Sequence, residues 1–153
     1  MKKINLYLVI MIGISSLNCN AKPETPTMDN TNYTSKQSSI QEVYLEEKTR
    51  GTNRAITFAP NEKTVTLNGV TTKTKVLPGE WDAIVKTVGK LNLSNLPKFE
   101  APTNKRYSDG ALISILKITS NGKTYSSADF DSGNPPAELK DLYNSIAPGF
   151  RKK

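Results

Sequence analysis

The chain has 153 residues with one cysteine and no histidine, and 21 Lys and Arg against 14 Asp and Glu give it a formal charge of +7. The absence of histidine excludes imidazole metal sites and Ser-His catalysis. Between residues 41 and 150 there are 14 basic and 12 acidic residues, so we do not expect nucleic-acid binding, which needs a clustered basic surface.

Residues 1–18 have the layout of a bacterial export signal. Two lysines precede an apolar stretch from Ile4 to Ile14, and small polar residues follow it. This stretch is well short of the roughly 20 apolar residues that a membrane-spanning helix needs. We therefore expect a signal peptide and an exported protein.

The single cysteine, Cys19, stands directly behind this signal. In this arrangement the chain resembles bacterial lipoproteins, and the resemblance implies that Cys19 becomes the acylated N-terminus that anchors the protein to a membrane. The alternative is an ordinary secretory signal with an incidental cysteine. Residues 19–39, rich in Thr, Ser, Asn and Pro, predict a lipidated N-terminus followed by a disordered tether.

Residues 40–150 are long enough for one domain with a modest core, and residues 151–153 form a basic tail. Alternation of apolar and polar residues predicts four strands. Asn68-Gly69 is typical of a type I′ hairpin between the third and the fourth. Thr and Lys in the fourth indicate an edge strand. The four strands cover residues 42–47, 54–59, 63–67 and 70–76.

Two amphipathic helices and two further strands complete the pattern. The first helix ends at Gly89, with Trp81 as a core residue, and a long connection covers residues 91–108. In residues 111–119, both the odd and the even positions carry apolar side chains, which is typical of a central strand covered on both faces. A turn at Asn121-Gly122 joins this strand to the next at residues 123–128. The helical stripes are Trp81, Ile84, Val85 and Val88, then Leu139, Leu142, Tyr143 and Ile146.

This order of elements predicts the α+β class, with an antiparallel sheet of about six strands and two helices packed on one face. No phosphate loop, dinucleotide fingerprint or nucleophile elbow is present, so we expect no cofactor. Asp129 and Asp131 partly match a calcium loop, but the glycine is misplaced and the final Glu is missing, so we expect no metal. We interpret these carboxylates and Asn134 as caps of the second helix.

Three short motifs suggest a second resemblance. They are Thr49-Arg50-Gly51, Asp109-Gly110-Ala111 and the segment from Phe130 to Pro136, spread over most of residues 41–147. With these motifs the chain resembles small uncharacterised lipoproteins of Bacteroidota-type bacteria. The resemblance implies a location in the cell envelope, in the outer membrane or facing the periplasm, and no activity.

Two classes of function fit these observations. The first is a lipid-anchored envelope protein that acts as a non-catalytic binding or interaction module, for an envelope protein partner, an inhibited enzyme or a wall component. The second is a histidine-independent hydrolase that uses carboxylates or Ser and Lys. We favour the first because nothing in the sequence assembles a nucleophile with a base.

The candidate contact residues are Arg106, Tyr107, Asp131 and Asn134. They lie in two loops that bracket the hairpin of residues 111–128. Since a hairpin returns the chain to the end where it began, we expect the four side chains to share one rim of the sheet and form a contact patch. The alternative is that Arg106 and Asp131 form only a surface ion pair, worth less than about 1 kcal/mol.

Overall fold

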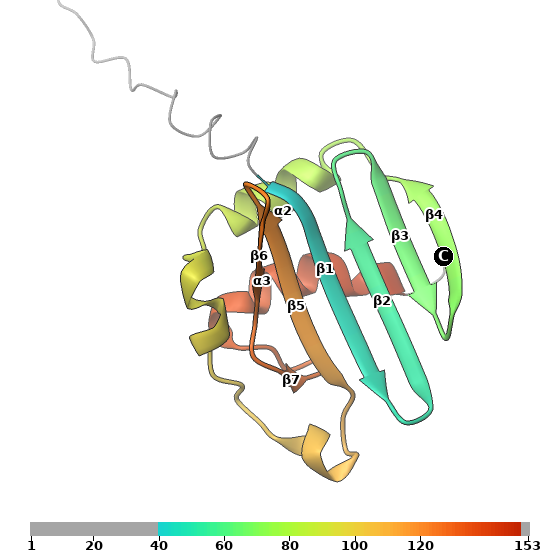
Figure 1. Cartoon of the computed structure of the whole chain (residues 1–153), viewed down its shortest axis with the longest axis vertical. Helices are drawn as coiled ribbons and strands as arrows, with labels where there is room; N and C mark the ends of the chain where they lie inside the picture. The colour runs from blue at the N-terminus through green and yellow to red at the C-terminus, as the bar shows by residue number, and fades with distance from the viewer. Residues whose placement is uncertain (1–39, 151–153) are drawn as a thin grey trace, which may run out of the picture.

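The computed structural model describes residues 40–150 (Figure 1). The expected signal peptide, Cys19, the tether and the basic tail lie outside the described residues, so these expectations stay predictions. None of the helices within residues 40–150 is long and apolar enough to cross a membrane.

Within residues 40–150, seven strands form one antiparallel sheet. Six of them lie in the order β4-β3-β2-β1-β5-β6, and the short β7 pairs with β5. β1 lies inside the sheet because it pairs with β2 on one side and with β5 on the other. The strands are β1 (Ile40–Thr49), β2 (Thr52–Phe58), β3 (Glu62–Leu67), β4 (Val70–Lys75), β5 (Ile113–Ser120), β6 (Lys123–Ser126) and β7 (Phe130–Asp131).

Two Asn-Gly turns connect neighbouring strands as predicted. Asn68 and Gly69 have φ angles of 48° and 86°, and Asn121 and Gly122 have φ angles of 51° and 72°. Positive φ at both central positions is the requirement of a type I′ turn, and Gly and Asn tolerate it best. The first turn leads into β4, which is an edge strand whose six residues are all exposed, so that prediction is confirmed.

The helices lie behind the sheet in Figure 1, and the core fills the space between the two layers. β1, β2 and β5 contribute alternate apolar residues to this core, and Trp81 of α2 packs against it half-buried. The α+β class with an antiparallel sheet is confirmed. The helices are α2 (Glu80–Val88) and α3 (Lys140–Ile146), with 3-10 turns η1 (Leu93–Lys98), η2 (Lys105–Ser108), η3 (Ala137–Leu139) and η4 (Ala147–Phe150).

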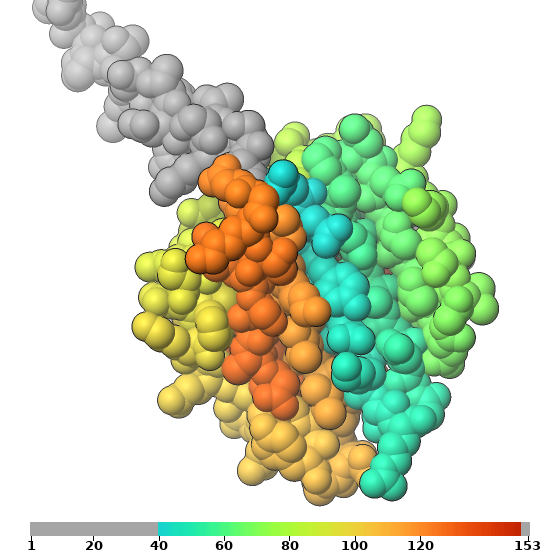
Figure 2. Space-filling model, in the orientation of Figure 1, coloured from blue at the N-terminus to red at the C-terminus, as the bar shows by residue number. Residues whose placement is uncertain are grey.

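The prediction that residues 111–119 form a central, doubly covered strand is wrong. β5 is the last but one of the six strands, and burial alternates along it. Leu116 and Ile118 are buried beneath the helices, whereas Ile113 and Ile115 are only half-buried on the opposite face. Figure 2 shows β5 and β1 at the surface on that face. There, Ile113 and Ile115 are shielded by their β1 neighbours and not by a second layer.

Gly149, in η4, provides a test of the packing between the last turn and the sheet. A Cβ atom at Gly149 would overlap Cδ1 of Ile56, which is fully buried, so the Ile56 side chain would have to repack within the core. We expect Gly149→Ala to lower the free energy of unfolding by about 1–3 kcal/mol, the range for an overpacked core, in urea denaturation. Gly51→Ala is the control because nothing lies within 4 Å of its added Cβ. Equal losses in the two variants would contradict the packing.

Candidate functional site

Arg106 is a buried arginine in the connection between η1 and β5. It lies in η2, which ends at Asp109 in the left-handed conformation, with φ of 56°. The side chain of Arg106 is only 7% exposed, and its guanidinium reaches across to the edge of the sheet. There Nε donates to Oδ2 of Asp129 at 2.9 Å, and Nη1 donates to Oδ1 of Asp131 at 3.1 Å and to the carbonyl of Thr103 at 2.7 Å.

Asp131 binds the same connection through its main chain. Its carboxylate accepts the backbone N–H of Lys105 at 2.8 Å and that of Arg106 at 3.0 Å, together with the hydroxyl of Thr103. Burial alone raises the pKa of Asp131, but the bonds from Thr103, Arg106 and Lys105 outweigh it and hold the pKa well below its usual range. Asp131 is therefore a fixed anion that fastens η2 to the sheet.

The pKa of Arg106 is raised, as expected for a cation paired with carboxylates. Burial alone lowers it, but the hydrogen bonds and charges of Asp129 and Asp131 raise it above its usual range. Arg106 and Asp131 are thus a buried, hydrogen-bonded ion pair, because only 7% and 3% of the two side chains is exposed. The alternative of a surface ion pair is wrong.

Tyr107 and Asn134 are the exposed members of the predicted patch. The Tyr107 ring is stacked on the guanidinium of Arg106 at 4.2 Å, and its hydroxyl accepts a hydrogen bond from Nη2 of Arg106 at 2.9 Å. Even so, Tyr107 is 69% exposed. Asn134 donates from Nδ2 to the Thr103 hydroxyl at 2.9 Å. The structure therefore brings all four predicted residues together, two as an internal frame and two at the surface.

The predicted helix caps are not formed. Asp129 and Asp131 bind Arg106 and the neighbouring main chain, and Asn134 binds Thr103. The helical segment begins after Pro136, and neither η3 nor α3 has a side-chain cap. The polar side chains that the local sequence pattern assigned to the helix therefore bind residues 103–106 instead.

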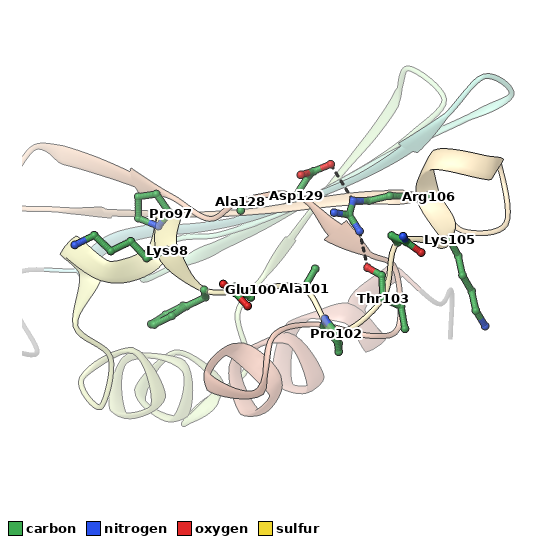
Figure 3. A pocket seen from close by; sticks show the side chains of 12 residues that line it. Pro97, Lys98, Glu100, Ala101, Pro102, Thr103, Lys105, Arg106, Ala128 and Asp129 are labelled. Carbon is green, nitrogen blue, oxygen red and sulfur yellow. Dashed lines mark hydrogen bonds and ion pairs between the residues drawn. The ribbon is translucent and has the colours of Figure 1, made fainter.

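A groove with a volume of about 780 Å³ opens beside Arg106. Figure 3 shows its two walls. One wall is the connection from Pro97 to Arg106, and the other is the sheet edge at Ala128 and Asp129. The volume lies within the range of ligand sites. The lining mixes apolar residues such as Phe99 with charged ones such as Lys98.

A second polar network, which our sequence reasoning missed, is centred on Glu47 at the end of β1. Glu47 is fully buried, and its Oε1 accepts the hydroxyls of Tyr143 at 2.6 Å, Ser132 at 2.9 Å and Ser114 at 3.0 Å. Its Oε2 accepts Nε of Arg54 at 2.7 Å. Burial and the Glu47 carboxylate raise the pKa of Tyr143. Glu47 shares the parity of Val43 and Leu45, which was the available signal of its burial.

No protein-family profile, curated protein sequence or solved structure matches this chain. The function must therefore be inferred from the residues and geometry described above.

The depressed pKa of Asp131 predicts how stability depends on pH. Its folded-state pKa lies below the unfolded value near 3.8, so its contribution is complete above that pH and is lost as pH falls toward the folded value. We expect the free energy of unfolding of the wild type to fall below about pH 4, and that of Asp131→Asn to depend less on pH there. Urea denaturation at several pH values measures both.

Asp109→Asn is the matched control for this pH series, because Asp109 is an exposed carboxylate in the same region. It should keep the wild-type pH dependence. A pH dependence of Asp131→Asn as steep as that of the wild type would contradict the role given to Asp131.

The Glu47 network predicts a difference between two adjacent glutamates. Glu47→Gln keeps the shape of the side chain but removes the charge that Arg54 and the hydroxyls bind. We expect it to lower the free energy of unfolding by about 1.5–3 kcal/mol, the range for hydrogen bonds to charged groups. Glu46→Gln, on the opposite face and paired with the exposed Lys48, should cost less than about 1 kcal/mol. Similar losses in chemical denaturation of the two variants would contradict this assignment.

Proposed function

We propose that the protein is a lipid-anchored module of the cell envelope that binds a partner and does not catalyse a reaction. The observation that carries the proposal is the position of Cys19 directly behind an export-type signal, in a chain that has no other cysteine and no histidine. Multiple acylation at this position gives durable membrane attachment, since one acyl chain alone holds a protein only marginally.

The Arg106 cluster supports a binding role because it presents an aromatic side chain on a rigid base. Tyr107 is exposed, yet its ring is stacked on a guanidinium that is itself fixed by Asp129 and Asp131. A pre-ordered side chain loses little conformational freedom on binding, and Tyr is enriched at protein interfaces. Tyr107 and Asn134 are therefore the contact residues that we propose, with Arg106 and Asp131 as their support.

The same cluster argues against the hydrolase alternative. A carboxylate pair that cleaves a bond needs one group that carries a proton and another that is free to act. Asp131 has a depressed pKa and four donors, and Asp129 is paired with Arg106. Both carboxylates of the cluster are thus used to hold the connection in place.

Cys19→Ser tests the membrane anchor. We expect the wild type in the membrane fraction and the variant in the soluble envelope fraction, because serine cannot accept the thioether-linked lipid. Cell fractionation followed by immunoblotting measures this distribution. Unchanged membrane association of the variant would contradict the anchor.

Partner recovery tests the contact residues. Wild type and a Tyr107→Ala, Asn134→Ala double variant are cross-linked in the envelope, and the captured proteins are identified by mass spectrometry. We expect the double variant to lose partners that the wild type recovers. Val70→Ala is the control, since Val70 is 71% exposed and lies on the opposite edge of the sheet. Identical recovery from the wild type and the double variant would remove Tyr107 and Asn134 from the interface.

A further inference from the structure

We infer that the groove beside Arg106 binds an extended segment of a partner polypeptide, three to five residues long, with acidic residues flanking an uncharged centre. This inference rests on the proposed binding function and names the chemistry of the partner. It starts from the main chain of the two groove walls, which offers hydrogen-bonding groups that the domain does not use.

On the sheet wall, main-chain N–H and C=O groups are unpaired because a β-bulge interrupts the ladder. Lys117 of β5 pairs with Ser126, and Ser114 pairs with Phe130. Two residues of β5 thus stand opposite three residues of the edge, 127–129, which is the extra residue of a bulge. Ser127 closes the ladder, because its N–H donates to the carbonyl of Leu116 at 2.8 Å and its hydroxyl accepts the Leu116 N–H at 3.0 Å.

The backbone beyond Ser127 is left open. Within residues 40–150, the main-chain N–H and C=O groups of Ala128 and Asp129 have no hydrogen-bond partner. The same holds for Glu100 and Ala101 on the facing wall. An unpaired strand edge is a ready template for an added strand. Here two such stretches line one groove, so an extended peptide can pair with either wall (Figure 3).

The ends of the groove limit the length of the peptide. η1 closes one end, where it packs against β6, and the Arg106 ion pairs close the other. Between them the groove is lined by residues 99–103 on one wall and by Ala128 and Asp129 on the other, and an extended chain advances about 3.3 Å per residue. Three to five residues therefore fit. Glu100 lies on the wall between the two ends with its side chain exposed, so its carboxylate disfavours acidic residues at the centre of the peptide (Figure 3).

The charges at the two ends select the flanks of the peptide. Lys98 and Lys105 lie at opposite ends of the groove (Figure 3), and within residues 40–150 neither ammonium group has an acidic partner. The charge of Arg106 is already matched by Asp129 and Asp131. Acidic residues before and after the uncharged centre complement the two lysines.

The test uses the full chain carrying Cys19→Ser and a mixture of capped pentapeptides with Glu at both ends and Ala, Val, Ser or Thr at the three central positions. Two-dimensional ¹H–¹⁵N NMR follows every backbone amide as the mixture is added at millimolar concentration. We expect saturable shifts at Glu100, Ala101 and Ala128. The same mixture with N-methylated central amides has fewer N–H donors and should cause no saturable shift.

Two variants at one position separate backbone pairing from other contacts. Ala128→Pro removes one N–H, and proline is tolerated on an open strand edge. We expect it to weaken binding about three- to tenfold, the effect of one hydrogen bond. Ala128→Gly keeps the N–H and should keep the wild-type affinity. Thermal melting checks that both variants fold, and the N-methylated mixture on wild type tests the same point without any variant.

No saturable shift at these amides, shifts centred elsewhere such as β4, or equal binding of the N-methylated mixture would each overturn the inference. These outcomes are independent of the proposed function. A chain that leaves the membrane with Cys19→Ser and loses partners with the Tyr107→Ala, Asn134→Ala variant keeps the proposed function even if the groove binds no peptide. Peptide binding without membrane anchoring would support the inference about the groove and contradict the proposed membrane anchor.

Discussion

The buried carboxylate of Glu47 is the constraint that holds β1, β2, β5 and α3 together at one end of the sheet. An ion pair taken out of water is tolerated only when its remaining lone pairs are satisfied. Glu47 meets this condition with donors from β2, β5, the loop after β7, and α3. These segments are far apart in the sequence, so the carboxylate fixes their relative positions. The Arg54 guanidinium also covers the ring of Phe150 at 4.7 Å, which extends the network to η4.

Two neighbouring residues join this network to the Arg106 cluster. Asp131 binds Arg106 and the 103–105 segment, while Ser132 binds Glu47. The Tyr143 hydroxyl, which donates to Glu47, also accepts the N–H of Gly133 at 2.8 Å. The short segment that follows the bulge is therefore held from both sides. This explains how residues 99–104, which form no helix or strand, can keep a groove open beside them.

Features determined by nearby residues were predictable from the sequence. The strands, both Asn-Gly turns and the edge position of β4 follow from alternation and from positive φ, which are local properties. The Glu47–Arg54 pair was also within reach. Both residues share the parity of buried neighbours, and they are directly opposite each other in the β1–β2 hairpin. A single charged residue at a core-facing position of a strand is expected to avoid burial. Two oppositely charged residues at facing positions can be buried together because each neutralises the other.

The burial of Arg106 could not be predicted in the same way. Its partners Asp129 and Asp131 are 23 and 25 residues away, and no period or motif relates the two loops. The proximity of the two loops was predictable. It follows from the geometry of a hairpin, and the Asn121-Gly122 turn predicts that hairpin. Which groups would be buried and which exposed depended on the contacts between these two loops, which no local pattern in the sequence reports.

The position of β1 has a consequence for the order in which the domain forms. β1 is the first strand of the domain, yet it lies inside the sheet and pairs with β5 in a register that joins Ile40 to Ser120. During synthesis β1 to β4 emerge first and can pair as a meander, but one long edge of β1 has no partner until residues 113–120 follow. Non-local pairings of this kind form slowly, and the unpaired N–H and C=O groups of an open strand edge can pair with other chains in the meantime. The nascent chain is thus most vulnerable to aggregation after its fourth strand and before its fifth.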